Sequence, residues 1–380
     1  MRRSLALAGL SARSMAETAF HDGFDVVALD LFGDVDTCAV ASRWFGIGAP
    51  SRLQIDEERV LSALAVLARQ GEVVGWVAGS GFEGRPELLA LGAALLPLIG
   101  TAPDAVARLR DPEQFFAFLT AHEIEHPPVR RAPADVDGSG WLLKDLRGSG
   151  GWHIRRAPLG ESAALAPGHY LQREMTGQPM SATFVATDTG VRLLGVNQQI
   201  VRAFGSLPFV YCGVVGPVPV ADHVQRHLDT ILQTLAVGFA LRGLASLDFL
   251  LDGERVLVLE VNPRPPASLE LYAAWSPMAA HVRACLHGEL PPRPVAAAPP
   301  ATAVRGHEIV FARQTVRLDA AAARRLADRP EAHDLPSAGQ QFAAGHPLCS
   351  IEACGRDAAE VLAQLHKRRE AVLQSLERSS

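Results

Sequence analysis

The sequence is poor in cysteine, in net charge and in long apolar runs. Its five cysteines are scattered and none forms a Cys-x-x-Cys pair, so we expect neither a disulfide framework nor a thiolate metal site, and a reducing cytoplasm fits best. The net charge of -5 creates no basic field, which argues against a nucleic-acid partner. The most apolar stretch, residues 88–100, is shorter than a membrane span and holds Pro97, so we expect neither a transmembrane helix nor a membrane partner.

The N-terminal segment also lacks a dinucleotide-binding fingerprint. Apolar segments at 4–10, 25–30 and 71–81 alternate with helical segments and predict a parallel, doubly wound sheet. Gly9 and Gly81 close two of these strands, but neither stands in a G-x-G-x-x-G pattern, so a dinucleotide site has weak support. A chain of 380 residues is too long for one small core, and we expect two or three subdomains.

The rest of the chain predicts a mixed α+β organisation, with strands and Gly-rich turns from about residue 139. The other expected elements are a helix over 104–120, a helix over 222–243, a Pro/Ala-rich linker at 291–304 and an amphipathic helix at 357–377.

The strongest polar pattern lies on a predicted hairpin at residues 246–262, with its turn at Asp252–Gly253. Asp248 and Glu260 would then be close on adjacent strands. Glu260 and Asn262 are two positions apart and share one strand face. Two carboxylates and an amide oxygen form the oxygen-rich site that Mg²⁺ prefers and often shares with nucleotide phosphates.

Strict alternation along the second strand separates a polar face from an apolar one. It places Glu260, Asn262 and Arg264 on one side and Leu259 and Val261 on the other. Arg264 could hold a phosphate or stabilise charge on a transferred group. A solvated hairpin with ordinary surface charge is the alternative, but the surrounding strands are nearly all apolar and the two carboxylates would repel each other without a cation.

A lysine followed by glycines forms the second polar pattern. Lys144 ends an apolar strand, and Gly148, Gly150 and Gly151 follow it. Glycines let backbone N–H groups turn toward an anion, and lysine adds a point charge. The order is not that of a P-loop, and a plain turn is the alternative. Beside a magnesium site, the segment becomes a candidate lid over a triphosphate.

Residues 122–126 match the H-E-x-x-H pattern of zinc peptidases. That motif needs both histidines on one helical face. His126 precedes Pro127, which pushes it out of the α region, so we interpret the segment as a helix end and expect no metallopeptidase site.

The order of Lys144, the Gly-rich loop, "QREM-x-G" at 172–177, Asp248 and "EVNPR" at 260–264 resembles the ATP-grasp superfamily over roughly residues 1–290. The resemblance implies an α/β and α+β fold with an N-terminal doubly wound pre-ATP-grasp domain, a two-lobed ATP-grasp core and a small C-terminal α/β cap. The implied boundaries are 1–103 for the first domain, 104–290 for the core (lid lobe about 130–180, metal-binding lobe about 181–290), 291–304 for the linker and 305–380 for the cap.

The resemblance also implies roles for individual residues. The ATP phosphates would contact Lys144 and a lid formed by Gly148, Gly150 and Gly151. The adenine and ribose would contact Gln172, Arg173, Glu174, Met175 and Leu250. Asp248, Glu260 and Asn262 would hold Mg²⁺ or Mn²⁺, and Arg264 would be the catalytic residue that stabilises the transition state. Gln172 stands where many members have Glu, and Pro179 replaces a Glu of some ligases, which puts the ribose contact in doubt.

Residues 197–217 would face the acceptor substrate, and Gln199 and Arg202 are candidates for binding a carboxylate, with a polar loop as the alternative. The pattern resembles a carboxylate–amine ligase subgroup associated with one-carbon cofactor biosynthesis of the tetrahydromethanopterin or methanofuran type, near tyramine–glutamate ligases. That subgroup implies ADP-forming amide synthesis through an acylphosphate, small-molecule acid and amine partners, and a homodimer. Biotin-carboxylase-like carboxylation and a non-catalytic nucleotide-binding module are the alternatives.

Overall fold

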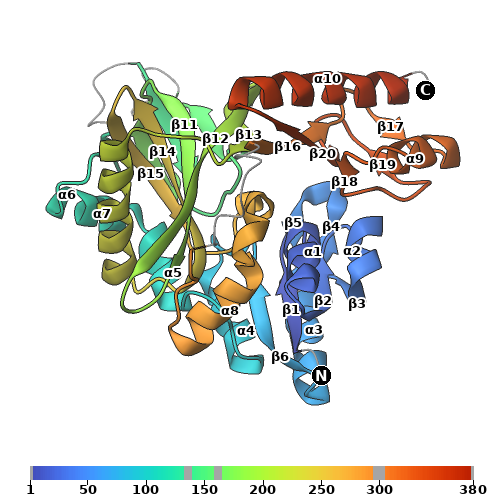
Figure 1. The fold of residues 1–380 in the computed structure, drawn as a ribbon, viewed down its shortest axis with the longest axis horizontal. Helices are drawn as coiled ribbons and strands as arrows, with labels where there is room; N and C mark the ends of the chain where they lie inside the picture. Colours follow the sequence, from blue (N-terminus) through green and yellow to red (C-terminus); the bar gives the residue numbers. More distant parts are fainter. Residues whose placement is uncertain (1–2, 132–138, 158–164, 294–303, 378–380) are drawn as a thin grey trace.

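The computed structural model describes residues 3–131, 139–157, 165–293 and 304–377. Its N-terminal part is a four-stranded parallel sheet of order β3-β2-β1-β6 with helices on both faces, which confirms the predicted doubly wound arrangement (Figure 1). The strands are β1 (Ser4–Ala8), β2 (Asp25–Asp30), β3 (Ala41–Gly46) and β6 (Val73–Ala78), and the helices are α1 (Arg13–His21), α2 (Val35–Val40), α3 (Glu57–Gln70) and α4 (Pro86–Leu95). The short β4 (Gly48–Ala49), η1 (Pro50–Arg52) and β5 (Gln54–Ile55) lie between β3 and α3.

Local sequence chemistry fixes the ends of these helices. The Asp56 side chain accepts a hydrogen bond from the backbone N–H of Arg59 at 3.1 Å and caps α3. Gly71 ends the same helix at a φ of 65°, a left-handed conformation that glycine adopts without a Cβ penalty. The apolar side of α3 then packs on the sheet through Val60, Leu64 and Leu67.

The single helix expected over 104–120 is wrong, because two helices occupy this segment. They are α5 (Pro103–Arg110) and α6 (Pro112–Ala121). Pro112 has no N–H to donate, and its ring would clash with the preceding turn, so it can only begin a helix. Asp111 between them caps α6 by accepting from the backbone N–H of Glu113 at 2.9 Å. α6 ends at Ala121, so the H-E-x-x-H histidines do not share a helical face, as predicted.

The middle of the chain forms a small antiparallel sheet that we call the lid sheet, of order β7-β10-β8-β9. It comprises β7 (Val129–Arg130), β8 (Trp141–Asp145), β9 (Ile154–Arg156) and β10 (His169–Arg173).

The largest sheet has eight strands in the order β15-β14-β11-β12-β13-β16-β20-β18. Its first part comprises β11 (Gln178–Ala186), β12 (Val191–Phe204), β13 (Leu207–Gly216), β14 (Gly243–Asp252) and β15 (Arg255–Asn262). One face of these strands buries α7 (Asp222–Gly238), and α8 (Pro277–His287) and η3 (Ala267–Trp275) lie between the other face and the N-terminal sheet. The cavity described below opens on this second face.

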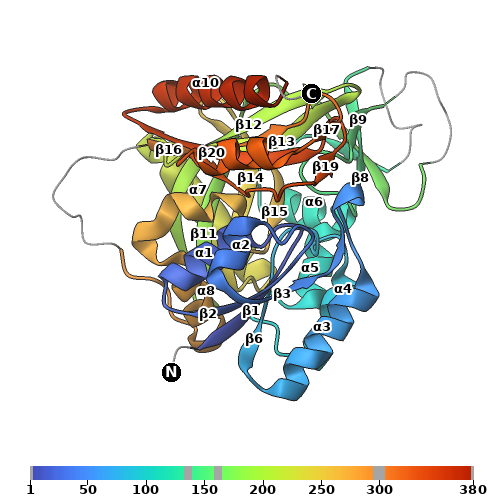
Figure 2. The ribbon, with the colours of Figure 1, turned by 90° about the vertical axis from the view of Figure 1, so that its right-hand side faces the viewer.

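The C-terminal segment extends the same sheet, because β16 pairs with β13. Its elements are β16 (Val304–Phe311), β17 (Val316–Arg317), α9 (Ala320–Ala327), β18 (Ala332–His333), β19 (Gln341–Phe342), β20 (Pro347–Gly355) and α10 (Ala358–Glu377). Figure 2 shows α10 and β20 above the N-terminal domain, and Leu335 N–H donates to Asp36 of α2 at 3.0 Å. Most of the predicted linker, residues 294–303, lies outside the described residues. Within the described ranges no helix combines the length and apolarity needed to span a bilayer.

Candidate active site

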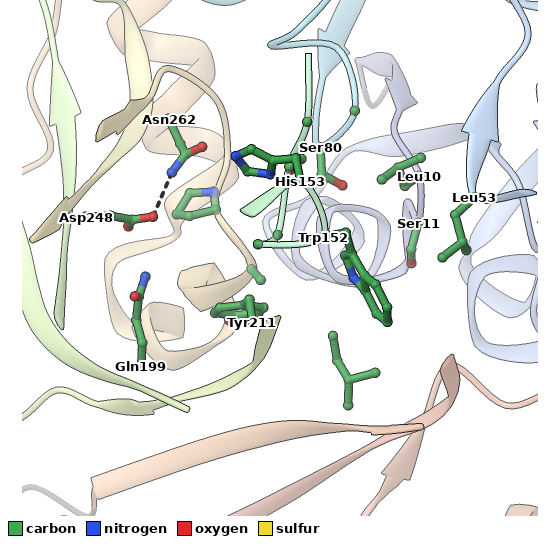
Figure 3. Close-up of a pocket in the computed structure, with 18 of the residues that line it drawn as sticks. Leu10, Ser11, Leu53, Ser80, Trp152, His153, Gln199, Tyr211, Asp248 and Asn262 are labelled. Atoms are coloured by element: carbon green, nitrogen blue, oxygen red, sulfur yellow. Dashed lines mark hydrogen bonds between the residues drawn. The ribbon is translucent and has the colours of Figure 1, made fainter. Parts of the chain in front are cut away.

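A cavity of about 1220 Å³ lies where the N-terminal domain, the lid sheet and the eight-stranded sheet meet (Figure 3). All but one of the site residues expected from the sequence line it. These are Lys144, Gly148, Gly150, Gly151, Gln172, Arg173, Glu174, Met175, Gln199, Asp248, Leu250, Glu260, Asn262 and Arg264. Positions spread over more than a hundred residues of sequence therefore converge on one space.

Hairpin β14–β15 supplies the carboxylates of the cavity, and Asp248 pairs directly with Glu260 across it. The turn is one residue later than predicted: Asp252 still pairs with Arg255, so Gly253 and Glu254 form the loop. Gly253 has a φ of 62°, which explains why glycine suits the first position of this two-residue turn.

A β-bulge corrects the expected alternation of β15. The register shifts between the Asp248 and Phe249 pairs, so Leu259 is the extra residue on β15. Before the bulge, Val258 is on the core face; after it, Val261 is on that face. Leu259 lines the cavity, so its predicted place opposite Glu260 is wrong. The bulge is what turns Glu260 into the cavity.

The pKa values of the two facing carboxylates, Asp248 and Glu260, are shifted in opposite directions. Burial, together with the charge of Glu260, raises the pKa of Asp248 despite the hydrogen bond it accepts from Asn262 at 3.1 Å. Burial also opposes ionisation of Glu260, but Arg110 and Lys144 outweigh it and lower its pKa. The described residues contain no group of three His, Cys, Asp or Glu that could hold a metal. The possible metal ligands at the hairpin are therefore the carboxylates of Asp248 and Glu260 and the amide of Asn262. A hard cation bound there would take most of its remaining ligands from other oxygen atoms.

Lys144 is a buried cation that lines the cavity. It is 5% exposed, and within the described residues no hydrogen bond or ion pair is formed by its ammonium. Burial lowers its pKa while Glu260 and Asp248 oppose that change. The chain has only two lysines among 36 basic residues, the other being Lys367. A lysine placed here in an arginine-rich chain is a sequence signal for a special role.

Arg110, at the end of α5, was not predicted. Its Nη1 lies 3.6 Å from Oε2 of Glu260, and its Nη2 donates to the carbonyls of Leu146 and Gly148 at 2.6 and 2.8 Å. One guanidinium thus joins the hairpin carboxylate to the glycine loop.

Glu83, in the loop after β6, was also missed. Its Oε1 accepts from Nε and Nη2 of Arg264 at 3.1 and 3.0 Å and from Oγ of Ser149 at 3.0 Å. Its Oε2 accepts from the Gly81 N–H at 2.7 Å. Although burial opposes ionisation, Arg264 and Arg110 lower the pKa of Glu83 to about 2. This ionised carboxylate holds both Arg264 and the glycine loop.

The glycine loop lies against β13. Gly150 and Gly151 have φ values of 61° and 79°, and the Gly150 carbonyl accepts from the Tyr211 N–H at 2.9 Å. A Cβ on Gly151 would lie 1.8 Å from the Phe209 carbonyl oxygen. A side chain at Gly151 would therefore force the loop away from β13.

The predicted hinge shows one buried amide without a partner. Gln172 is 1% exposed, and its Nε2 makes no hydrogen bond within the described part of the chain. Glu174 instead pairs with Arg156 at 2.8 Å, so this carboxylate already has a cationic partner.

Arg202 is the expected site residue that does not reach the cavity. Gln199 and Val201 line the cavity, and the next side chain of a strand points to the opposite face. There Arg202 donates to Glu308 at 2.6 Å, and Arg369 donates to the same carboxylate at 2.8 Å. The prediction of Arg202 as a substrate ligand is wrong for this structural reason.

With this geometry in place, comparison with known proteins is informative. A family model described as an ATP-grasp domain matches residues 111–268. This segment is therefore similar to ATP-grasp domains. The carbamoyl phosphate synthase large chain of Pseudomonas syringae pv. tomato is 26% identical over 198 residues, which cover 46% of this chain but only 18% of that protein.

Two solved structures share the fold of this chain over nearly its whole length. The L-amino acid ligase of Bacillus licheniformis superposes with a TM-score of 0.68 at 14% identity, covering 96% of both chains. Biotin carboxylase from Campylobacter jejuni, in a β,γ-ATP complex, gives a TM-score of 0.70 at 13% identity, covering 99% of this chain and 95% of that one. These identities show a common fold.

The segment matched by the family model does not contain every group that shapes the cavity. Glu83 and Arg110 precede the matched residues 111–268, yet they hold Arg264 and Glu260 by direct contacts. Glu83 stands between Gly81 and Gly84 in the loop that follows β6. An acid in a glycine-rich strand end is the only sequence signal that marked it.

Proposed function

We propose that the chain is an ATP-dependent carboxylate–amine ligase that forms an amide through an acylphosphate. The observation that carries the proposal is the meeting of Asp248 and Glu260 with Lys144 and Arg264 in one cavity. Buried charges of both signs are costly unless they are paired or bind a ligand. A nucleoside triphosphate with its metal ion supplies both anionic and cationic partners.

The unpaired polar atoms suggest how the nucleotide lies. The Lys144 ammonium would meet the phosphates, and the N–H groups of the glycine loop would complete their binding. Gln172 Nε2, buried without a partner, would donate to the adenine edge, and Leu250 would pack against the ring. The hinge backbone from Arg173 to Met175 would lie beside the adenine and ribose.

The hairpin residues fit a magnesium or manganese ion. Asp248, Glu260 and the Asn262 amide oxygen would hold it, and the ion would neutralise charge on the transferred phosphoryl group. The fit rests on the raised pKa of Asp248, which burial and its neighbour Glu260 cause. A divalent cation would relieve this repulsion and favour the ionised carboxylate.

The chemistry follows in two steps. A carboxylate oxygen of the acid attacks the γ-phosphorus, the bond to the β–γ bridging oxygen breaks, and ADP leaves. The amine nitrogen then attacks the acyl carbon, the bond to the phosphate oxygen breaks, the nitrogen loses a proton and inorganic phosphate leaves. Arg264, held by Glu83 at 3.0 Å, would stabilise the charge of the transferring group, so positioning and electrostatics dominate.

The substrates we propose are glutamate and an aromatic amine or amino acid, joined in one-carbon cofactor biosynthesis. The sequence resemblance to tyramine–glutamate ligases supports this choice. We further propose a homodimer in a reducing compartment such as the cytoplasm, where free cysteines such as the buried Cys212 and Cys349 would persist.

The test is a screen of acid and amine pairs for ADP release. ADP and phosphate that form only when both an acid and an amine are present support the ligase. Release of AMP and pyrophosphate would contradict the acylphosphate route. ADP release with bicarbonate in place of the acid would indicate carboxylation, and nucleotide binding without turnover for any pair would indicate a binding module.

A further inference from the structure

The cavity contains a second buried charge cluster, which nothing in the proposed nucleotide site uses. We call Arg13, Glu17, Glu270 and Asp334 the Arg13 cluster. Arg13 Nη1 donates to Glu17 at 2.9 Å, Nε donates to Asp334 at 3.1 Å and Nη2 donates to Glu270 at 3.1 Å. These residues come from α1, η3 and the segment after β18, and all but Glu17 line the cavity.

The Arg13 cluster has more acid than base. One guanidinium that is 5% exposed faces three carboxylates that are each 25% exposed. Asp34 is a further acid near Asp334, and burial together with the charge of Asp334 raises the pKa of Asp34 to about 7. His307 also faces the cluster, but burial lowers its pKa and favours its neutral form. His333, whose pKa is raised by Glu352, is the other cationic candidate near the cluster, and its Nε2 lies 3.7 Å from Oε1 of Glu352.

A separate observation points to a missing partner at this place. His307 is 9% exposed and lines the cavity, and its Nδ1 is buried with no hydrogen-bond partner among the described residues. Its Nε2 lies 3.5 Å from the Tyr211 hydroxyl. Leaving a buried polar atom unpaired costs free energy, which a bound polar ligand would recover.

Tyr211 connects this end of the cavity to the hairpin. Its phenol is close enough to interact electrostatically with both Asp248 and Glu270, and Figure 3 shows it between Gln199 and Trp152. A ligand at the Arg13 cluster would therefore lie next to the site where we propose phosphoryl transfer.

We propose that the Arg13 cluster binds the ammonium group of the amine substrate. An ammonium has three N–H donors and no acceptor, so Glu270 and Asp334 are suitable partners. Arg13 is already shared by three carboxylates, which makes it a poor partner for a fourth. The cavity is also lined by Leu10, Phe32, Leu53 and Phe342, so the ammonium should be carried on an apolar body. That the bound amine is a substrate rests on the proposed ligase function.

Binding of three probes of similar shape tests the inference without turnover. Phenethylamine is a cation, phenethyl alcohol is neutral and phenylacetate is an anion at neutral pH. We expect calorimetry with the full chain and MgADP to show at least about tenfold tighter binding of phenethylamine than of the other two, because hydrogen bonds to charged groups are the stronger ones. Glu270→Gln and Asp334→Asn should each remove most of that preference.

A matched control separates the local effect from a general one. Glu370 on α10 has a side chain 26% exposed and also pairs with arginine, at 2.8 Å from Arg313, but it does not line the cavity. Glu370→Gln should keep the full preference for phenethylamine. Asp334 has a φ of 54°, and asparagine tolerates this left-handed conformation, so Asp334→Asn should fold.

A second measurement needs no cluster variant. Phenethylamine should shift the nuclear magnetic resonance signal of the His307 ring, assigned by comparison with His307→Gln. Equal binding of the three probes, tighter binding of phenylacetate, an unshifted His307 signal or a preference that survives both cluster variants would each overturn the ammonium site. None of these results bears on acylphosphate formation, and an inactive ligase screen would leave this binding result intact.

Discussion

The hairpin end of the cavity and the Arg13 end both bury charge, but in different proportions. At the hairpin end, three cations (Lys144, Arg110 and Arg264) stand against three carboxylates (Asp248, Glu260 and Glu83). At the other end, Arg13 alone faces three carboxylates. A balanced set can accept a nucleotide together with its metal ion, whereas an acid-rich set calls for an added cation. We therefore propose that the nucleotide binds at the hairpin end and the ammonium group at the adjoining Arg13 end of the same cavity.

The largest effect should come from removing a carboxylate at the hairpin end. Glu260→Gln should lower the rate of ADP formation by about 100-fold or more, because it removes a proposed metal ligand and a charge that faces Lys144 and Arg110. Glu254→Gln is the control: it lies in the turn of the same hairpin, with a side chain 75% exposed. Equal rates for wild type and Glu260→Gln would show that the metal assignment is wrong.

The next effect concerns the cations of the same end. Lys144→Met should weaken ADP binding by roughly tenfold to a hundredfold, because a buried charge-assisted contact with phosphate is lost. Lys367→Met, on α10, changes the only other lysine of the chain and should bind ADP normally. Calorimetry measures both, and similar affinities for the two variants would contradict the comparison.

A smaller effect is expected from the positioning residue Glu83. Glu83→Gln keeps a hydrogen-bond acceptor but loses the charge that holds Arg264, so kcat should fall by about tenfold while the KM for ATP changes little. Glu58→Gln, an exposed position on α3, is the matched control. A rise in the KM for ATP with kcat preserved would mean that Glu83 serves nucleotide binding and does not position Arg264.

The smallest effect is a gain in stability at the acid-rich end. Burial and the neighbouring Asp334 raise the pKa of Asp34 from 3.8 to about 7. The folded state therefore holds this proton more tightly than the unfolded state does, and the resulting stability is full below pH 3.8 and is lost as the pH rises through about 7.

Asp34→Asn removes this charge while keeping a good N-cap for α2, since the side-chain oxygen still accepts from the Thr37 N–H. Thermal unfolding at neutral pH should move to a higher temperature, and the stability difference from wild type should vanish in acid. If the variant were less stable than wild type at neutral pH, the claim that carboxylates outnumber cations at the Arg13 end would be contradicted.

The sequence predicted the parts of this account that depend on local pattern. The hairpin, the parallel N-terminal strands and the convergence of Asp248 with Glu260 follow from alternation and turn chemistry. The bulge at Leu259 did not follow, because an inserted residue leaves the run of strand-forming residues unchanged. The break at Pro112 does carry a sequence signal, because proline begins a helix and does not continue one.

The sequence did not predict contacts between segments that lie far apart along the chain. Glu83 meets Arg264 across 181 positions, and neither local neighbourhood identifies the other. Arg202 shows the reverse error, because a polar residue close to a site in sequence was assigned to it. One step along the strand turned Arg202 toward Glu308 instead.

The most direct test of the central claim follows heavy oxygen from the acid. When the carboxylate of glutamate carries the heavy isotope and an accepting amine is present, acylphosphate formation must transfer one labelled oxygen to inorganic phosphate. The account predicts label in phosphate and in the amide carbonyl, with none in the nucleotide. Label in AMP, or amide formed without label in phosphate, would contradict it.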